Sequence, residues 1–361
     1  MTRTKIAIVG CGCISGIYLK NLTTLFADTI EIAAVCDLIP ERALEAQKQY
    51  NIPKAVFTDE EIMNDPEIEM VLNLTTPDQH KPVNMMALRA GKHAYCEKPL
   101  ACTRADGEEQ VAYAKAHGLL LGGAPDTFLG GGIQTCRKLI DEGWIGTPVA
   151  ATATMLCHGH ESWHPDPEFY YKPGAGPMFD MGPYYLTALV NLLGRVKSVA
   201  GATRITFPQR TITSEKHYGE IIDVEVPTHI AGILNFESGA IGTLVTSFDV
   251  YNDTQAGFVV YGSKGSLRVP DPNTFGGPVQ ILLPGAEGWQ DVPVVYGFTD
   301  NSRGLGVADF CRCIREGGIP RGSCEQTFHV LDLMCAFHEA SDRGRVVELA
   351  SPYTRKPARE L

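Results

Sequence analysis

The chain lacks the features of several protein classes. No apolar run is long enough to cross a bilayer, and the first residues, "MTRTKIAIVG", pass into a strand pattern without the layout of a signal peptide. Lysine and arginine number 31 against 42 acidic residues, and no basic stripe with interleaved aromatics occurs. This charge balance disfavours a nucleic-acid partner. We therefore expect a cytoplasmic protein with neither a membrane nor a nucleic-acid partner.

The chain also lacks the spacing of a metal site or a disulfide framework. Eleven cysteines are present, but no pair of CxxC elements occurs among them. Cys11 and Cys13 flank a glycine, and Cys311 and Cys313 stand two apart in a predicted helix, where their side chains point to different faces. The cysteines are expected to be mostly buried thiols in a reducing compartment, and no bound metal is expected.

The first third of the chain alternates strand-like and helix-like segments. The pattern predicts strands over 5–9 and 31–36, and further strands that end at residues 57, 74 and 96, each followed by a helical stretch. Such alternation is typical of a doubly wound parallel sheet, which binds ligands at the carboxyl ends of its strands. We assign residues 1–123 to an α/β domain of this kind.

The pattern changes after Gly123. A glycine-rich link precedes a predicted helix over 133–142, and strand-like runs then follow one another without intervening helices. Strands in series predict antiparallel pairing. Two predicted helices, over 303–316 and 325–342, close the chain. We assign residues 124–361 to a second, α+β domain with a large, mainly antiparallel open sheet.

The segment "VGCGCISG" lies between the first predicted strand and the first helix. Gly10 would allow a tight turn there, and Gly12 would let the backbone approach a pyrophosphate at the positive end of the helix. Asp37 ends the next strand, 27 residues beyond Gly10, where a carboxylate accepts hydrogen bonds from ribose hydroxyls. It would repel a 2′-phosphate, which favours NAD over NADP, and Arg42 is the one residue that could compensate. The turn residues expected at the dinucleotide are Gly10, Gly12, Cys13 and Ile14.

The segment "YCEKPLA" follows the strand that ends at Cys96. Lys98 would project from the carboxyl edge of the sheet, where the nicotinamide of a dinucleotide should lie. The glycine turn, the strand-end Asp37, "TTPDQH", "AGKHAYCEKPLA" and a later Asp-x-Gly segment together resemble the Gfo/Idh/MocA family of NAD(P)-dependent oxidoreductases. The resemblance covers nearly the whole chain, and "EKP" is its most specific element.

The resemblance implies a Rossmann domain, an active site at the interface of the two domains, and Lys98 in contact with substrate or catalytic groups. It also implies a homo-oligomer, a dimer or a tetramer, built on the sheet-rich domain. The further residues that match cofactor-contacting positions of the family are Thr75, Thr76, Pro77, His80 and Glu97.

The second domain departs from the family pattern. The family commonly carries Asp-x-Gly-x-His-x-x-Asp, whereas this chain has Asp180, then Tyr184 in place of the histidine and Thr187 in place of the later acid. Oxidation of an alcohol needs a base for the hydroxyl proton. Tyr184 can serve if a lysine ammonium lowers its pKa from about 10, so a Tyr184/Lys98 pair oriented by Asp180 is one workable arrangement.

The loop "CHGHESWHPDPEFYYKPGAGP" offers an alternative base. His164 or His160 could take the place of the missing histidine, and the aromatic face of Trp163 suits a sugar ring. Three histidines within seven residues also raise the question of a metal, but no pattern of zinc ligands at helical spacing supports one. The residues expected to line a substrate pocket are Asp126, Thr127, His158, His160, Trp163 and Tyr170.

Together these patterns predict an NAD-dependent oxidoreductase that oxidises or reduces a secondary hydroxyl or keto group of a sugar, polyol or glycoside. Hydride would pass to or from C4 of the nicotinamide. One alternative is a redox-neutral enzyme that keeps NAD bound and uses transient oxidation to eliminate or hydrolyse a glycosidic group. The other is a non-catalytic regulator that senses the cofactor; loss of the family histidine favours it, while Lys98 and Asp180 argue against it.

Overall fold

The computed structural model describes residues 2–251 and 257–359. They form two compact units, each made of two separate stretches of chain. The first unit comprises Met1–Asp126 and Asn301–Leu331, and the second comprises Thr127–Asp300 and Asp332–Leu361. Residues 301–331, predicted to belong to the second domain, pack as part of the first unit.

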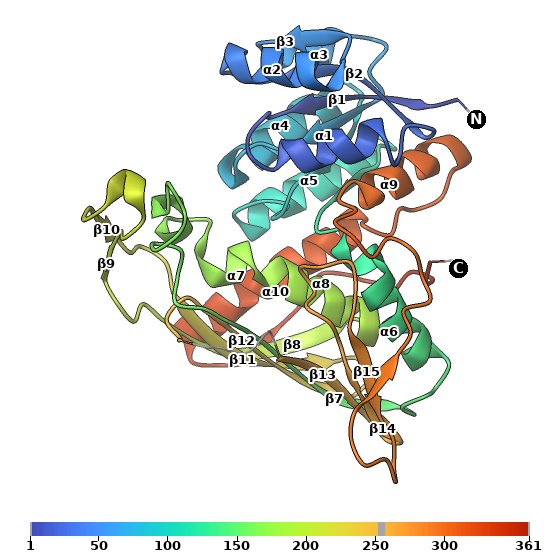
Figure 1. Cartoon of the computed structure of the whole chain (residues 1–361), viewed down its shortest axis with the longest axis vertical. Coiled ribbons are helices and arrows are strands. Elements are labelled where there is room, and N and C mark those ends of the chain that lie inside the picture. Colours follow the sequence, from blue (N-terminus) through green and yellow to red (C-terminus); the bar gives the residue numbers. More distant parts are fainter. Residues whose placement is uncertain (1, 252–256, 360–361) are drawn as a thin grey trace. The chain divides into compact units, whose positions relative to one another are not determined.

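A six-stranded parallel sheet forms the centre of the first unit, in the strand order β3-β2-β1-β4-β5-β6 (Figure 1). Its elements up to β6 are β1 (Thr4–Val9), α1 (Ser15–Thr23), β2 (Ile30–Cys36), α2 (Pro40–Tyr50), β3 (Lys54–Val56), α3 (Asp59–Asn64), β4 (Met70–Asn73), α4 (Pro77–Arg89), β5 (His93–Cys96), α5 (Arg104–Ala116) and β6 (Leu121–Gly123). The order reverses between β1 and β4, and the carboxyl ends of the strands at such a reversal are where doubly wound sheets bind dinucleotides. The predicted Rossmann fold is confirmed.

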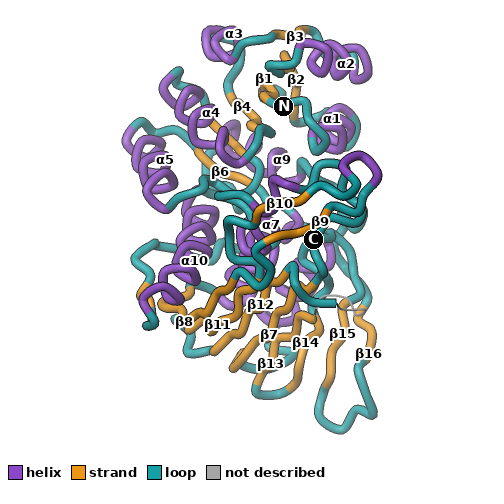
Figure 2. The backbone as a smooth tube through the Cα atoms, turned by 90° about the vertical axis from the view of Figure 1, so that its left-hand side faces the viewer, coloured by secondary structure: helices purple, strands orange, loops and turns teal. Residues whose placement is uncertain are grey.

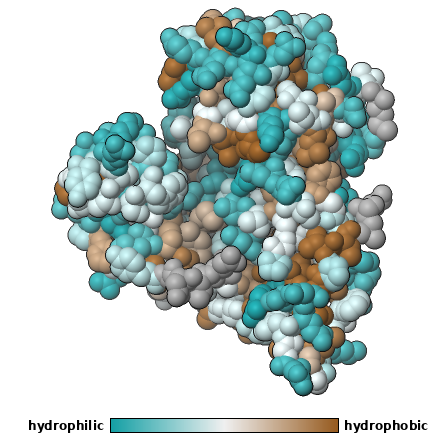
Figure 3. All heavy atoms as spheres, viewed as in Figure 1, coloured by the Kyte–Doolittle hydropathy of each residue, from teal (hydrophilic) through white to brown (hydrophobic). Residues whose placement is uncertain are grey.

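Burial explains why these segments form the sheet. The apolar run of β1 has no exposed residue, as expected for a central parallel strand. Helix α2 shows the opposite pattern, because it buries only Ala43 and Ala46 and turns its charged residues outward. The surface over α2 and α3, at the top of Figure 3, is accordingly mainly hydrophilic.

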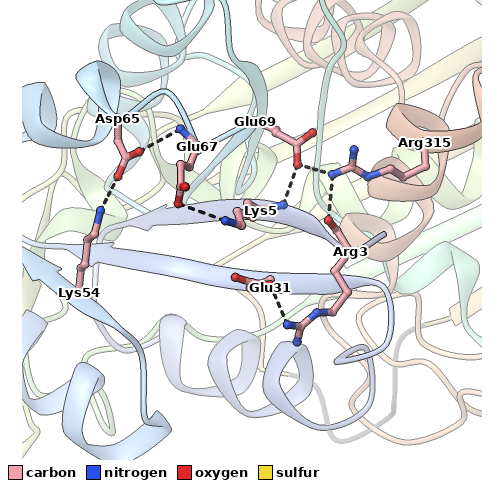
Figure 4. Close-up of polar contacts among 8 residues, drawn as sticks. All are labelled: Arg3, Lys5, Glu31, Lys54, Asp65, Glu67, Glu69 and Arg315. Carbon is pink, nitrogen blue, oxygen red and sulfur yellow. Dashed lines mark hydrogen bonds and ion pairs between the residues drawn. The ribbon is translucent and has the colours of Figure 1, made fainter. Parts of the chain in front are cut away.

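The late segment of the first unit carries α9 (Leu305–Glu316), which packs against β1. Figure 4 shows the polar contacts at the amino ends of β1 and β2. Arg315 of α9 donates to the carbonyl oxygen of Arg3 at 2.9 Å and pairs with Glu69. Glu69 also accepts from the backbone N–H of Lys5 at 2.9 Å. Residues more than 240 positions apart are thus joined at this end of the sheet.

The second unit is built on a nine-stranded sheet, in the order β16-β15-β14-β13-β7-β12-β11-β8-β17. Figure 2 shows β8, β11, β12, β7 and β13 side by side. The strands are β7 (Pro148–Leu156), β8 (Val196–Arg204), β11 (His229–Phe236), β12 (Ile241–Ser247), β13 (Gly257–Gly262), β14 (Gly265–Arg268), β15 (Val279–Leu282), β16 (Gln290–Val292) and β17 (Val347–Glu348). All pairs are antiparallel except β7 with β12. The predicted mainly antiparallel sheet is confirmed.

Helices pack on this sheet and on one another. Phe337 of α10, for example, is fully buried against the backbone of β8 and β11. The α-helices are α6 (Gly131–Asp141), α7 (Gly176–Asp180), α8 (Gly182–Leu193) and α10 (Cys324–Arg343), which begins in the first unit, and the 3-10 helices are η1 (Thr127–Leu129), η2 (Glu168–Tyr171) and η3 (Glu215–His217). A separate two-stranded ribbon pairs β9 (Gln209–Thr211) with β10 (Ile221–Asp223).

Candidate active site

The glycine turn follows β1 directly. Gly10 has φ +97°, and a Cβ there would lie 2.7 Å from the backbone of Leu74, so only glycine fits between the turn and the end of β4. Ser15 fixes the other side of the turn, since its backbone N–H and its hydroxyl both donate to the carbonyl oxygen of Gly12. A Cβ on Gly12 would meet no atom within 4 Å. The turn is therefore packed at Gly10 and open at Gly12.

These two glycines give a prediction that separates folding from binding. Gly10→Ala should destabilise the protein by about 1–3 kcal/mol, because alanine is strained at this φ and its Cβ meets backbone. Gly12→Ala should leave stability unchanged but weaken NADH binding by about 1–3 kcal/mol, because the methyl group occupies the open side of the turn. Thermal unfolding and titration of NADH fluorescence measure the two effects.

Gly288→Ala is the matched control, because a Cβ at Gly288 also meets no atom within 4 Å and the residue lies outside the turn. It should alter neither stability nor NADH affinity. Unchanged NADH binding by Gly12→Ala would mean that the dinucleotide does not approach the turn at this glycine.

Asp37 follows β2 and is tied to the glycine turn. Its Oδ2 accepts from the backbone N–H of Cys11 at 2.8 Å, and its Oδ1 accepts from that of Ile39 at 2.8 Å. Burial, and next the charge of Asp37, raise the pKa of the Cys11 thiol to about 12. Arg42 is exposed on α2. Asp37 therefore holds the turn, a role that the sequence pattern did not predict, and its contact with ribose hydroxyls stays a prediction.

The segment after β5 is braced through the side chain of Glu97. Its Oε1 accepts from the hydroxyl of Tyr18 at 2.7 Å, and its Oε2 accepts from the backbone N–H of Lys98 at 2.9 Å. The backbone N–H of Glu97 donates to the carbonyl oxygen of Asn73, the last residue of β4. Glu97 is buried and Lys98 is half-buried. The structure therefore fixes the backbone that carries Lys98 at the carboxyl edge of the sheet.

The segment after β4 begins α4, with Thr76 at the N-cap position and Pro77 as the first helical residue. His80, one turn later, is only 1% exposed. Its two ring nitrogens lie 2.6 Å from the carbonyl oxygen of Pro99 and 3.1 Å from that of Thr75. The imidazole is thus placed between two backbone segments inside the unit, and its predicted cofactor contact stays a prediction.

Asp126, of the first unit, and Thr127, of the second, are both buried. Asp126 accepts from the backbone N–H groups of Gly304 and Gly306, at 2.8 and 3.0 Å, and so caps the start of α9. Loss of water on burial raises the pKa of this carboxyl to about 6, although the two N–H groups oppose the shift. Substrate contacts by Asp126 and Thr127 stay predictions.

In the second unit, His160 lies in a cluster of aromatic rings. It stacks on Tyr170, with ring centres 3.9 Å apart and an interplanar angle of 11°, and meets the edge of Phe248 at 4.5 Å. Its Nε2 lies 4.0 Å from Oδ2 of Asp180, the last residue of α7. The structure therefore brings together His160 and Tyr170, which lie in the predicted loop, and Asp180, which follows the loop.

Two other rings of this loop, those of Trp163 and His164, also contact the cluster, whereas the ring of His158 packs elsewhere. Trp163 is 62% exposed and lies 5.4 Å from the His160 ring. His164 packs edge-on against Tyr170, and its Nδ1 accepts from the backbone N–H of Asp166 at 3.0 Å. His158 stacks instead on Tyr251, with ring centres 3.7 Å apart. His158 thus has different partners from His160 and His164.

Tyr184 is buried near the start of α8. The backbone turns between Asp180 and Tyr184, because α7 ends at Asp180 and α8 begins at Gly182. These two residues belong to the second unit and Lys98 to the first. The predicted pairing of Tyr184 with Lys98 stays a prediction.

One buried ionic group in the second unit was not foreseen. Arg210 of β9 donates to Oε1 of Glu161 at 2.9 Å and also pairs with Asp249. Glu161, which adjoins His160, accepts further from the hydroxyl of Tyr171 at 2.6 Å. We call Glu161, Arg210 and Asp249 the ionic triad. The ionic triad anchors the start of the loop that carries His160 and His164. No local pattern in the sequence joins residues so far apart.

Two family models match the chain. The model of an oxidoreductase family with an NAD-binding Rossmann fold matches residues 4–123, and the Gfo/Idh/MocA C-terminal domain matches residues 133–268. The chain belongs to the Gfo/Idh/MocA family. The predicted membership is confirmed, and the protein is an NAD-binding oxidoreductase, as the sequence predicted.

Relatives within the Gfo/Idh/MocA family match over most of the chain. Trans-1,2-dihydrobenzene-1,2-diol dehydrogenase of Mus musculus is 26% identical over 86% of this chain and 88% of its own length. 1,5-anhydro-D-fructose reductase of Ensifer adhaerens is 27% identical over 88% of this chain and 91% of its own. The structure of levoglucosan dehydrogenase with NADH and levoglucosan has a TM-score of 0.83 at 19% identity, covering 97% of this chain and 100% of that one, and shares its fold.

The residues of the first unit fit the NAD that this Gfo/Idh/MocA domain binds. Gly12 leaves the turn open beside the start of α1, and Asp37 presents a carboxylate at the end of β2. Within residues 2–251 and 257–359, no three His, Cys, Asp or Glu side chains are grouped to hold a metal ion. Every helix of the described chain is too short or too polar to cross a membrane.

Proposed function

We propose that this protein oxidises a secondary hydroxyl group of a sugar or polyol, or reduces the corresponding ketone. The observation that carries the proposal is the braced Lys98 at the same sheet edge as an open glycine turn, in a Gfo/Idh/MocA chain. The relatives named above support the substrate class, because their names specify a diol, an anhydrofructose and levoglucosan. Glycosides belong to the same proposed class.

The proposed roles divide between the two units. Gly10, Gly12 and Asp37 hold the dinucleotide, whose nicotinamide accepts or supplies a hydride when bound. Lys98 binds the substrate oxygen that changes between hydroxyl and carbonyl, and its ammonium stabilises negative charge there. The exposed face of Trp163 packs against the apolar face of the sugar ring.

His160 is the base that this arrangement favours. A carboxylate near an imidazole stabilises the imidazolium that forms when the ring takes a proton, and Oδ2 of Asp180 lies 4.0 Å from Nε2 of His160. His164 fits less well, because its Nδ1 already accepts from the backbone of Asp166. Tyr184 stays the alternative base.

A panel of inositols, free hexoses and glycosides tests the function and the base together. With NAD, the wild type should produce NADH from at least one compound. His160→Asn and Asp180→Asn should lower kcat by about 10²–10⁴-fold, the usual contribution of a general base, whereas His164→Asn and Tyr184→Phe should retain most activity.

The other outcomes are equally informative. Collapse of kcat in Tyr184→Phe, with His160→Asn active, would make the phenol the base. Product formation without NADH, by protein that retains its cofactor, would replace the dehydrogenase with redox-neutral elimination. Cofactor binding without turnover of any compound would favour a cofactor-sensing regulator.

The predicted homo-oligomer is also part of this proposal. Ile233, Ile241 and Tyr261 lie on the outward face of the nine-stranded sheet, at 44%, 54% and 37% exposure. Apolar side chains on a sheet face support self-association there. Sedimentation of the wild type should give a dimer or tetramer.

A further inference from the structure

A chain of buried side-chain amides runs through the first unit beneath Lys98. Asn73 Nδ2 donates to Asn84 Oδ1 at 3.0 Å, and Asn84 Nδ2 donates to Gln110 Oε1 at 2.8 Å. Gln110 Nε2 then donates to the carbonyl oxygen of Leu100 at 3.3 Å. All three side chains are fully buried. We call Asn73, Asn84 and Gln110 the amide chain.

The two ends of the amide chain determine its direction. At one end, the backbone N–H and the hydroxyl of Thr75 donate to Oδ1 of Asn73, at 3.2 and 2.6 Å. At the other end, the carbonyl oxygen of Leu100 can only accept. Each amide between them must therefore present oxygen toward Thr75 and nitrogen toward Leu100. Reversing one amide would oppose two donors or two acceptors in a buried place, which is costly.

His80 makes a second link between the same two segments. Burial lowers the pKa of its imidazole. Its Nδ1 lies 2.6 Å from the carbonyl oxygen of Pro99, and its Nε2 lies 3.1 Å from that of Thr75. His80 and Asn84 stand four residues apart on α4 and so lie on one face of the helix. Two successive carbonyl groups, those of Pro99 and Leu100, are thus held from α4 and α5.

We propose that the amide chain and His80 are positioning groups. They fix the segment that carries Lys98, residues 97–100, relative to the segment that ends at Thr75, residues 73–75. These groups do not need to touch substrate or cofactor, because they act through the carbonyl groups of Pro99 and Leu100, which follow Lys98. Glu97 braces the residue from its other side, through the N–H of Lys98 and the hydroxyl of Tyr18. This inference rests on the proposed function only for the role of Lys98. It predicts that a substitution at Gln110 loosens the backbone at both Lys98 and Thr75.

Gln110→Met tests the inference, because methionine keeps the volume and removes all three hydrogen bonds of the side chain, the one accepted from Asn84 and those donated to Leu100 and Asp106. Gln110→Glu is a second variant of nearly the same shape, which keeps an acceptor for Asn84 and loses the amide donor to the carbonyl oxygens of Leu100 and Asp106. Asn21→Leu is the matched control within the same unit, since the buried Asn21 amide donates to the carbonyl oxygens of Asn301 and Arg303, at 2.9 and 2.8 Å, away from the amide chain.

Two measurements follow. Hydrogen exchange of the free protein should be faster at the amides of both Lys98 and Thr75 in Gln110→Met and Gln110→Glu, and unchanged there in Asn21→Leu. With the substrate found in the panel, kcat should fall about 10–100-fold in the Gln110 variants, as expected for a displaced catalytic group, with little change in NADH affinity. In a Lys98→Met background the Gln110 substitutions should lower kcat no further.

Exchange that is faster only at Lys98, or no faster than in Asn21→Leu, would overturn the inference, as would an equal loss of kcat in the Lys98→Met background. Full activity of Lys98→Met alone would instead contradict the proposed function. The exchange measurement would then still decide whether the amide chain fixes this segment.

Discussion

Lys98→Met should lower kcat by about 10²–10⁴-fold, equivalent to about 3–5 kcal/mol of transition-state stabilisation, while NADH still binds. Methionine keeps the length of the stem and removes the ammonium, so charge on the reacting oxygen loses its stabilising partner. The backbone contacts that brace residue 98 use no atom of the lysine side chain. Steady-state kinetics with the substrate found in the panel, together with NADH fluorescence titration, separate the two effects.

Lys81→Met provides the control for this prediction. Lys81 also lies in the first unit, but its ammonium pairs with Asp106 and Glu109, at 2.6 and 2.7 Å, in partly exposed positions. Its loss should leave kcat nearly unchanged, because such pairs contribute little. If Lys98→Met is as active as Lys81→Met, the ammonium of Lys98 is not part of the reaction.

Arg210→Met should destabilise the second unit by about 3–5 kcal/mol. The substitution leaves Glu161 and Asp249 buried and without the guanidinium that lies between them, and an uncompensated buried charge is costly. Denaturant unfolding followed by tryptophan fluorescence measures this selectively. The chain has three tryptophans, Trp144, Trp163 and Trp289, and all belong to the second unit.

The matched control is Arg343→Met. Arg343 pairs with Glu339 at 2.6 Å one turn away on α10, and its side chain is 53% exposed. This substitution should cost about 1 kcal/mol at most. An equal, small loss for Arg210→Met would mean that the ionic triad does not hold the loop in place by its charges.

Local patterns predicted the elements of the fold well. The apolar run "KIAIV" predicts a strand and the spacing of residues 40–50 predicts a helix, and the structure has β1 at Thr4–Val9 and α2 at Pro40–Tyr50. Residues 14–26 carry apolar side chains at helical spacing and predict a helix to residue 26, whereas α1 ends at Thr23. Its last hydroxyls explain the difference, because Thr23 and Thr24 bond back to the carbonyl oxygens of Leu19 and Lys20.

For the candidate site, the sequence predicts which residues lie near one another only where those residues follow strands. Gly10, Asp37 and Lys98 stand at strand ends, so the topology of a parallel sheet brings them to one edge. The ionic triad joins residues 161, 210 and 249, and the cap of α9 joins Asp126 to Gly304. Such contacts depend on how distant segments pack, and no periodicity or spacing within the sequence encodes them.

The first unit is made of two stretches that lie far apart in the sequence, so it cannot be completed until late in synthesis. Asp126 leaves the ribosome long before Gly304 and Gly306, whose N–H groups it accepts, and β1 emerges before the α9 segment that covers it. At about 5–20 residues per second, the intervening chain takes roughly 10–35 seconds to make. Through that interval the nascent sheet lacks the helix that later packs against β1, so apolar surface stays exposed and can aggregate. A fragment that stops at residue 126 would carry the same exposed surface permanently.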